Sequence, residues 1–267
     1  MGVISDWFFE HLLQLVDTAY PPKSKGRPRS VSNAECITVL WHVIRSGASW
    51  SSLRDIITIY DPHTVRRRVA KWIESGIIDQ SYTHLQQYII SNNLIPDEDK
   101  EIMVIDATFI RNINGIDIKG KNHYDRYRQS NKLSLIITKT EIPLATTLVQ
   151  GNKTDLSQVL STLIEVPNMP EPAILLGDKG YIDRWTRTYL NQYANVNLIA
   201  KTKTNALHPN TPEEEQLLDK YRSKVESVFA TFHSHKRVHE RSEKKFIIFQ
   251  AYCKCVIINM TCRKLAI

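Results

Sequence analysis

The sequence predicts an α/β protein in two parts, an all-α region over residues 1–95 and a mixed α/β region over residues 96–267. Three observations predict this division. Apolar residues in the first part recur at helical spacing, whereas the second part contains short apolar runs typical of buried strands. The polar stretch NNLIPDEDKE (92–101) separates the two patterns. A chain of 267 residues, 42% of them hydrophobic, is long enough for one large domain or two smaller ones.

Helical spacing is clear in the first part. One helix is expected over about residues 6–20. The segment AECITVLWHVIRSG (34–47) has its apolar residues at i, i+3, i+4 and i+7, which is one face of a helix. Ser32 or Asn33 can cap this second helix, and Gly47 ends it.

The third helix, PHTVRRRVAKWIESG (62–76), carries its apolar and basic residues on different faces. Val65, Val69 and Trp72 form the inner face. The basic side chains left largely outside are those of Arg66, Arg67, Arg68 and Lys71. Three short helices with a basic last one suggest a helix-turn-helix unit. An ordinary helical bundle with a charged solvent face is the alternative, and this segment alone favours the bundle.

Strand patterns dominate the start of the second part. The run IMVIDATFI (102–110) is apolar on both faces and predicts a strand in the middle of a covered sheet. KLSLIITKT (132–140) and PLATTLVQG (143–151) predict a hairpin. PAILLGD (172–178) and VNLIAKTK (196–203) predict two further strands.

Helical patterns lie between and after these strands. Helices are expected over residues 155–166 and 183–194, the second capped by Asp183. A long helix is expected from about Glu213 to Lys236, and a final one over about residues 246–265. The order β-β-β-α-β-α-β-α is that of a ribonuclease-H-like α/β core, with three antiparallel strands followed by alternating strands and helices.

Positive charge is concentrated at the end of the chain. The formal net charge is +7, and residues 220–267 hold eleven Lys/Arg against three acids. A second basic run comprises Lys23, Lys25, Arg27 and Arg29. This balance favours a polyanionic partner, although mild basicity alone is weak evidence.

Targeting and redox features indicate an intracellular protein. The N-terminus contains acids and lacks the basic start and apolar block of a signal peptide. We found no apolar run of membrane-spanning length, so no membrane partner is expected. The four cysteines lack paired zinc spacing and are expected to be reduced. The expected location is the cytoplasm, associated with the nucleoid, or the nucleus in a eukaryote.

Three carboxylates lie at positions that are suitable for a catalytic or metal-binding role. Asp106 interrupts an apolar strand, where an acid is costly unless a hydrogen-bond partner or a metal compensates it. Asp178 ends a second strand, and carboxyl ends of neighbouring strands share one crevice. Glu226 lies beside the apolar stripe of the long helix, on the same face as Arg222.

Such a set of carboxylates suits hard divalent cations. Oxygen ligands favour Mg²⁺ or Mn²⁺, and two ions about 3.5–4 Å apart can activate an attacking oxygen and stabilise a leaving one in phosphodiester chemistry. The alternative is that each acid is satisfied separately: Asp106 by a backbone turn, Asp178 as a strand-end cap and Glu226 by Arg222. The appearance of all three in this order favours the shared site.

The chain resembles the DDE transposases of the bacterial insertion-sequence-five group, which are akin to the Harbinger transposases of eukaryotes, over nearly its whole length. The N-terminal region resembles the helical DNA-binding domain of that group at GRPR (26–29), WHVIRSGASWSSLRD (41–55) and TVRRRVAKW (64–72). The first catalytic motif appears at residues 105–108 (IDAT). The most specific match is the second, GDKGY (177–181).

The third motif resembles RSKVESVF (222–229), and the sequence departs from the group at three nearby or related places. The group usually has a lysine seven residues after the glutamate, where this chain has His233, and Lys236 is a possible substitute. The tyrosine that the group places before the arginine is displaced to Tyr221. In GNKTDL (151–156), Thr154 replaces a frequent histidine.

The resemblance implies a metal-dependent DNA transposase that works by cut-and-paste transposition. Asp106, Asp178 and Glu226 would be the catalytic residues and the ligands of two Mg²⁺ or Mn²⁺ ions in each active site. The partners would be double-stranded DNA, both transposon ends and target, and a second copy of the chain in a homodimer on paired ends. The DNA-binding residues expected are Arg27, Arg29, Arg66, Arg67, Arg68, Lys71, Lys179, Arg222, Lys236 and Arg237.

Other readings remain open at this point. A nuclease or resolvase of the same fold would cut DNA without joining it, and a domesticated DNA-binding protein would keep the core only as a scaffold. The linker KGRPR (25–29) either lies in a minor groove or is simply solvated. His233, His235 and His239 suggest a zinc site less strongly than a basic helical face. Trp185 and Tyr189 are expected to pack in the core.

Overall fold

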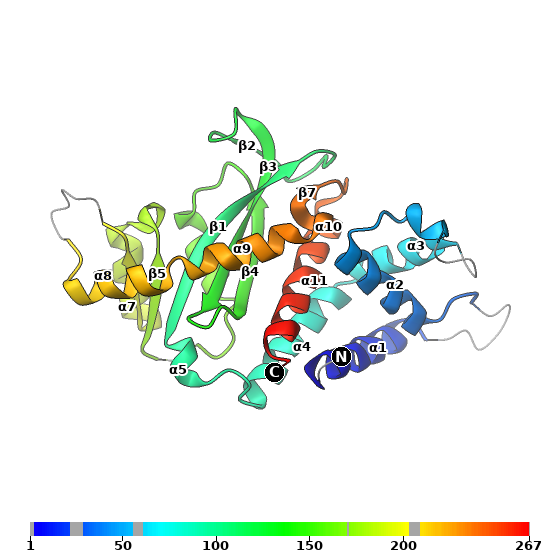
Figure 1. Ribbon diagram of the computed structural model, residues 1–267, viewed down its shortest axis with the longest axis horizontal. Helices are drawn as coiled ribbons and strands as arrows, with labels where there is room; N and C mark the ends of the chain where they lie inside the picture. Colours follow the sequence, from blue (N-terminus) through cyan, green and yellow to red (C-terminus); the bar gives the residue numbers. More distant parts are fainter. Residues whose placement is uncertain (1–2, 22–28, 56–60, 170, 203–208, 267) are drawn as a thin grey trace. The chain divides into compact units, whose positions relative to one another are not determined.

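The structure is a computed structural model that describes the chain except for residues 1–2, 22–28, 56–60, 170, 203–208 and 267 (Figure 1). It divides into two compact units. Unit 1 consists of residues 1–85, 113–117 and 232–267, and unit 2 of residues 86–112 and 118–231. Chain segments far apart in the sequence therefore meet within unit 1. The predicted linker Arg27 lies outside the described residues.

Unit 1 is built mainly of helices. Its elements are α1 (Val3–Ala19), α2 (Asn33–Ser46), the 3₁₀ turn η1 (Ser52–Asp55), α3 (Pro62–Glu74), the first part of α4 (Ile77–Ser91), the last residues of α9 (Lys224–Ser234), α10 (Lys236–His239), β7 (Glu240–Arg241) and α11 (Phe246–Lys264). The second predicted helix is confirmed at both ends. Ser32 and Glu35 form a capping box, and Gly47 closes the helix in the left-handed conformation.

The predicted inner face of α3 is confirmed. Val65, Val69 and Trp72 are buried, and Asp61 caps the helix with Pro62 in its first turn. Arg66, Arg67 and Lys71 are exposed, as the sequence predicts. Arg68 differs, because its guanidinium donates to the Val31 carbonyl and to Asn33 inside unit 1.

α11 is the core helix of unit 1. Its residues are apolar and buried on almost all sides, including Cys253, Cys255 and Cys262, which carry free thiols. By length and composition alone the helix could cross a membrane, contrary to the reading of the sequence, but 72% of that stretch is buried inside the structure. Burial of this extent is typical of the central helix of a folded domain.

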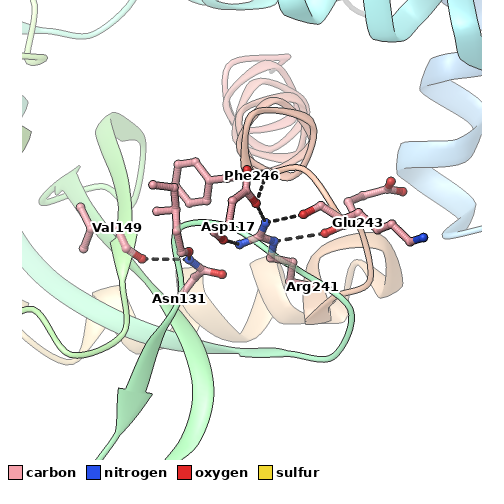
Figure 2. Close-up of polar contacts among 8 residues, drawn as sticks. Asp117, Asn131, Val149, Arg241, Glu243 and Phe246 are labelled. Carbon is pink, nitrogen blue, oxygen red and sulfur yellow. Dashed lines mark hydrogen bonds and ion pairs between the residues drawn. The ribbon is translucent and has the colours of Figure 1, made fainter.

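A buried arginine holds the start of α11 (Figure 2). Arg241 is fully buried, and its guanidinium contacts the carboxylate of Asp117 and donates to the carbonyls of Asp117 and Lys244 at 2.7 and 2.9 Å. The same carboxylate accepts from the Phe246 N–H at 2.9 Å. Burial tends to raise the pKa of Asp117, but these hydrogen bonds and the charge of Arg241 outweigh it and hold the pKa below its usual value.

Unit 2 contains six strands of a mixed seven-stranded sheet. Its strands are β1 (Ile102–Asn112), β2 (Gly120–Asn122), β3 (Arg128–Thr138), β4 (Pro143–Gln150), β5 (Ala173–Gly177) and β6 (Val196–Ala200). β1 pairs with β3, and β3 with β2 and β4, in antiparallel fashion. β1–β5 and β5–β6 are parallel. The predicted hairpin and the predicted change from antiparallel to parallel strands are confirmed.

The helices of unit 2 are shorter than expected. They are the rest of α4, α5 (Asp97–Lys100), the 3₁₀ turns η2 (Leu156–Gln158) and η3 (Lys179–Tyr181), α6 (Val159–Leu163), α7 (Arg184–Ala194), α8 (Pro212–Tyr221) and most of α9. The predicted single helix over 213–236 is wrong, because α8 and α9 are separate. The Glu226 N–H bonds to the Ser223 carbonyl three residues back, so the chain tightens at Arg222.

α7 corrects a second prediction. Asp183 caps it as expected, its side chain accepting from the Thr186 N–H at 2.7 Å. Trp185 and Tyr189 do not pack in the core, since they are 65% and 37% exposed. With Tyr193 they form a row of neighbouring rings at i, i+4 and i+8, with centroids 5.2 and 4.9 Å apart. The helix buries Thr186 and Leu190 instead.

Candidate active site

Parallel pairing of β1 and β5 aligns the first two carboxylates. The last paired residues are Val104 on β1 and Leu176 on β5. Asp106 and Asp178 each come two residues later, at matching positions just past the end of the pairing. Neighbouring parallel strands lie about 4.8 Å apart. The two acids therefore face the crevice beyond the carboxyl ends of the strands, where open α/β sheets bind ligands.

The surroundings of Asp106 disfavour the ionised form of its carboxyl group. Burial raises its pKa to about 6, and the charges of Asp178 and Asp155 add to this rise. The Ala107 N–H, which donates to Asp106 Oδ1 at 2.8 Å, and the charge of Arg222 act in the opposite direction. A neighbouring cation would favour the ionised form that burial disfavours.

Asp178 is held by the turn that follows it. Its Oδ1 accepts from the Gly180 N–H at 2.6 Å and so caps the 3₁₀ turn η3. A Cβ at position 180 would lie 3.0 Å from Asp178 Oδ1 and 3.1 Å from Asp155 Oδ2. A larger residue at position 180 would therefore crowd both carboxylates, which favours glycine at this place in the GDKGY segment.

Arg222 links Asp178 to Glu226. Its Nη2 lies 3.9 Å from Asp178 Oδ2, and its Nη1 lies 3.6 Å from Glu226 Oε1. The expected i, i+4 relation between Arg222 and Glu226 is therefore present. Glu226 has a 60% exposed side chain, which leaves it free to turn. Arg222 Nε is buried and has no hydrogen-bond partner among the described residues.

The separate contacts foreseen by the alternative reading are also present. Asp106 accepts a backbone N–H, Asp178 caps a turn, and Glu226 lies beside Arg222. Each contact occupies only part of its carboxylate, and Asp106, Asp178 and Glu226 are all connected through the charge of Arg222. The separate contacts of these three acids are therefore compatible with a shared site in unit 2.

The donor chemistry of this site fits a hard divalent cation, although the side chains do not yet form its coordination shell. Across the part of the chain that the structure describes, no three His, Cys, Asp or Glu side chains are placed to hold a metal ion together. Asp106, Asp155, Asp178 and Glu226 offer carboxylate oxygens, the ligands that Mg²⁺ and Mn²⁺ prefer.

Sequence reasoning missed Asp155 and Lys132. Asp155 Oδ1 accepts from Lys132 Nζ at 2.7 Å, and Lys132 has a side chain that is only 6% exposed. The signal was present in the sequence, since Lys132 is a charge at the start of the apolar strand segment KLSLIITKT. GNKTDL (151–156) contains Asp155 itself, next to the unusual Thr154.

The basic residues expected to bind DNA have different surroundings. Arg67, Lys71, Lys179 and Lys236 are exposed. Arg66 lies 3.4 Å from Glu243, and Arg29 donates to the Tyr20 carbonyl at 3.0 Å. Arg237 is nearly buried, pairs with Glu243 and lies 4.8 Å from the centroid of the Tyr252 ring.

The three histidines near the end of α9 do not share one environment. The rings of His233 and His239 are edge to face with centroids 5.9 Å apart, and His235 is buried. Burial lowers the pKa of His233, and the charge of His239 adds to this effect. His233 is thus held mainly in its neutral form by its surroundings.

The chain is similar in sequence to known proteins. Residues 97–260 match the transposase DDE domain family, which is more than half of the chain. A transposase of insertion sequence element IS402 from Burkholderia cepacia is 28% identical over 156 residues, covering 54% of this chain and 70% of that protein.

A solved structure shares the fold. The piggyBac transposase, in a synaptic complex with hairpin DNA, aligns with a TM-score of 0.59 and 9% identity over 98% of this chain and 73% of that one. The Mos1 mariner paired-end complex with Mn aligns with a TM-score of only 0.34 and 13% identity, over 96% of this chain and 84% of that one. The likeness to the piggyBac structure shows a shared fold, and the strand order of unit 2 fits the ribonuclease-H-like core that the sequence predicts.

The family match spans β1, with Asp106, the turn that holds Asp178, and the helix that carries Glu226. It thus includes every element of the carboxylate site. The chain belongs to the transposase DDE domain family, and it is a DNA transposase, a metal-dependent enzyme that cleaves DNA and transfers strands.

Proposed function

We propose that Asp106, Asp178 and Glu226 are the catalytic triad of this transposase and hold two Mg²⁺ or Mn²⁺ ions. The observation that carries the proposal is the matching position of Asp106 and Asp178 just past the paired ends of β1 and β5, with Arg222 linking Asp178 to Glu226. When bound, the ions would polarise the scissile phosphodiester and stabilise charge on the attacking and leaving oxygens.

The chain's own residues orient the DNA in this proposal. Arg222 is a candidate for contact with a phosphate, because its buried Nε has no partner among the described residues and a guanidinium fits a phosphate well. Lys179 is exposed directly beside Asp178 and can meet the DNA backbone near the cut. Water hydrolyses a phosphodiester and frees a 3′-hydroxyl at a transposon end. That hydroxyl then attacks a target phosphodiester in line, forms a new phosphodiester and releases a 3′-hydroxyl of the target strand.

The chain is further proposed to be a member of the insertion-sequence-five group. The support is the motif set IDAT (105–108), GDKGY (177–181) and RSKVESVF (222–229). We place DNA-end binding in a helix-turn-helix-like domain over residues 1–95 and catalysis in residues 96–267. Arg67 and Lys71, exposed on α3, are the strongest candidates for phosphate contacts in the first domain.

Assembly and location are part of the same proposal. Two copies of the chain would act as a homodimer that pairs the two transposon ends, with double-stranded DNA as partner. The enzyme would work where the DNA lies, in the cytoplasm with the nucleoid or in a nucleus. The net charge of +7 supports association with a polyanion but does not distinguish these locations.

The test is a joining assay with purified protein and DNA that carries the element's own ends. With Mg²⁺ or Mn²⁺ the protein should nick the ends and join them to target, and Asp106→Asn should reduce both steps by at least about 10³-fold. Asp219→Asn, an exposed acid on α8, is the matched control and should behave as wild type. Equal cleavage by Asp106→Asn and wild type would show that the triad is misassigned.

The same assay distinguishes the other activities that the fold permits. Released ends without joined products would indicate a nuclease or resolvase. DNA binding with no metal-dependent cleavage would indicate a DNA-binding protein with an inactive core. Either outcome contradicts the proposed transposition by this chain.

A further inference from the structure

We infer that Asp155 is a fourth carboxylate of the active site, an oxygen ligand for a divalent cation beside Asp178, and that Lys132 is the residue that positions it. This inference rests on the proposed function, because it assumes that the cations bind near Asp106 and Asp178. It goes beyond the triad, since neither Asp155 nor Lys132 belongs to the three motifs that the sequence shows.

Lys132 is a charge that is hard to explain by folding alone. It lies on β3, with Phe109 of β1 on one side and Val149 of β4 on the other. It is 4% exposed, and its Nζ lies 4.5 Å from the centroid of the Phe109 ring. An apolar residue would fill such a position with less cost than a buried ammonium, which needs a close partner.

That partner is Asp155, and the contact uses only one of its oxygens. Lys132 Nζ donates to Oδ1 at 2.7 Å. Oδ2 receives no hydrogen bond from any described residue. Asp155 precedes the 3₁₀ turn η2, yet its carboxylate does not cap that turn. The ion pair therefore fixes the carboxylate and leaves one oxygen available to a further ligand.

The available oxygen points to the Asp178 turn. The Cβ position of Gly180 is 3.1 Å from Asp155 Oδ2 and 3.0 Å from Asp178 Oδ1. The two oxygens are separated by at most the sum of these distances, about 6 Å. Ligand oxygens around a pair of ions that are themselves about 3.5–4 Å apart span such distances. Asp155 is thus within reach of a cation that Asp178 binds.

Lys132 and Asp106 lie on opposite faces of the sheet. Side chains alternate along β1, so Phe109 and its neighbour Lys132 share one face, and Asp106 lies on the opposite one. Asp106 and Asp155 nevertheless lie close enough to interact, because the charge of Asp155 acts on Asp106.

The electrostatic effects of Asp155 on its neighbours agree with its short distance from the Asp178 turn. The negative charge of Asp155 acts on Asp106 and on the buried Tyr181, together with that of Asp178. Burial first, and then these three carboxylates, raise the pKa of Tyr181. Three carboxylates thus share one region of unit 2 with the cations Lys132 and Arg222. A divalent cation would relieve the remaining repulsion.

The test measures Mn²⁺ binding by the full chain in the absence of DNA, by electron paramagnetic resonance of free Mn²⁺. Asp155→Asn should weaken binding about tenfold or more, because it removes an anionic ligand. Its melting temperature without metal should fall, because Lys132 is left buried without its carboxylate partner, so binding is measured at a temperature at which the variant is folded. Asp219→Asn is the control for loss of one negative charge in unit 2 and should leave the affinity unchanged.

Lys132→Met tests the positioning role through the sign of its effect. If Lys132 acted only through its charge, removing it would tighten Mn²⁺ binding, because one repulsive cation would be gone. If Lys132 orients Asp155, binding should weaken in spite of the lost repulsion. Should this variant fail to fold, Asp155→Asn alone decides the inference.

The outcomes separate this inference from the triad. Unchanged Mn²⁺ affinity in Asp155→Asn, with weakened affinity in Asp178→Asn, overturns the fourth ligand and leaves the triad intact. Unchanged affinity in Asp106→Asn and Asp178→Asn overturns the proposed site as a whole. A lower melting temperature in Asp155→Asn with unchanged Mn²⁺ affinity shows that the Lys132–Asp155 pair stabilises the fold and does not bind the cation.

Discussion

Arg222 explains how a cluster of acids can fold before a metal arrives. Its guanidinium lies 3.9 Å from Asp178 and 3.6 Å from Glu226, and its charge lowers the pKa of Asp106 against the larger effect of burial. Both ion pairs are long and partly exposed, so each contributes little to stability, less than about 1 kcal/mol. A guanidinium held this weakly can leave the carboxylates to a divalent cation and turn to a phosphate.

A histidine pair in unit 1 predicts a pH dependence of folding. His11 Nε2 lies 2.6 Å from His84 Nδ1, so the two rings cannot both be protonated without losing this contact. Burial lowers the pKa of His11 below 6.5, and the charge of His84 adds to this effect. Above pH 6.5 both folded and unfolded chains are neutral at this position. As the pH falls through 6.5, the unfolded chain binds the proton first, so stability decreases.

The measurement is the melting temperature between pH 7.5 and 5.5. The wild type should lose about 1–3 °C over this range through this pair, and His11→Gln should remove that part of the slope. His42→Gln, an exposed histidine on α2, is the control and should keep it. Identical slopes in wild type and His11→Gln would disprove the role of the pair.

The secondary-structure elements that the sequence predicts well are those with a strong local pattern. The caps at Ser32 and Asp183, and the inner face of α3, depend on a few neighbouring residues and could be derived from them. The strand around Asp106 was also clear, because a lone acid in an apolar run is conspicuous. Two of the three triad acids could then be placed at one sheet edge from element order alone.

The features that were missed depend on contacts between distant segments. The break between α8 and α9 at Arg222 leaves the apolar stripe intact, so periodicity does not reveal it. The Lys132–Asp155 pair joins residues 23 positions apart and follows from strand register, which the sequence pattern does not determine. Trp185 and Tyr189 look like core residues by composition, but the tertiary packing of α7 turns Leu190 inward instead.

The helices α3 and α7 each carry one tryptophan, and the two side chains should contribute differently to the free energy of unfolding. Trp72 is 1% exposed and Trp185 is 65% exposed. Trp72→Ala should lower the free energy of unfolding by about 3–5 kcal/mol, because it leaves a cavity in unit 1. Trp185→Ala should change it by less than about 1 kcal/mol, since only ring contacts with Tyr189 are lost. Denaturant unfolding of both variants checks this, and a large loss for Trp185→Ala would contradict its exposed position.

Over the whole molecule, the net charge differs from the charge on the surface that DNA can contact. Residues 220–267 carry eleven basic residues, which by composition mark a DNA-binding tail. Within unit 1, Arg241 of this segment is buried and contacts Asp117, and Arg237 is nearly buried and contacts Glu243. Their charges stabilise the start and surroundings of α11. A count of basic residues therefore overestimates the surface that DNA can contact.

A pair of arginine variants separates these two uses of charge in one experiment. Arg67 on α3 is exposed, and its removal should weaken DNA binding and reduce the slope of log affinity against log salt by about 1, with an unchanged melting temperature. Arg237→Gln leaves Glu243 buried with only the longer contact to Arg66, at 3.4 Å. It should lower the free energy of unfolding by about 2–4 kcal/mol and leave the salt slope of the folded fraction unchanged. A reduced slope with normal stability in Arg237→Gln would mean that this arginine leaves Glu243 for DNA, and the electrostatic footprint would then extend to α10.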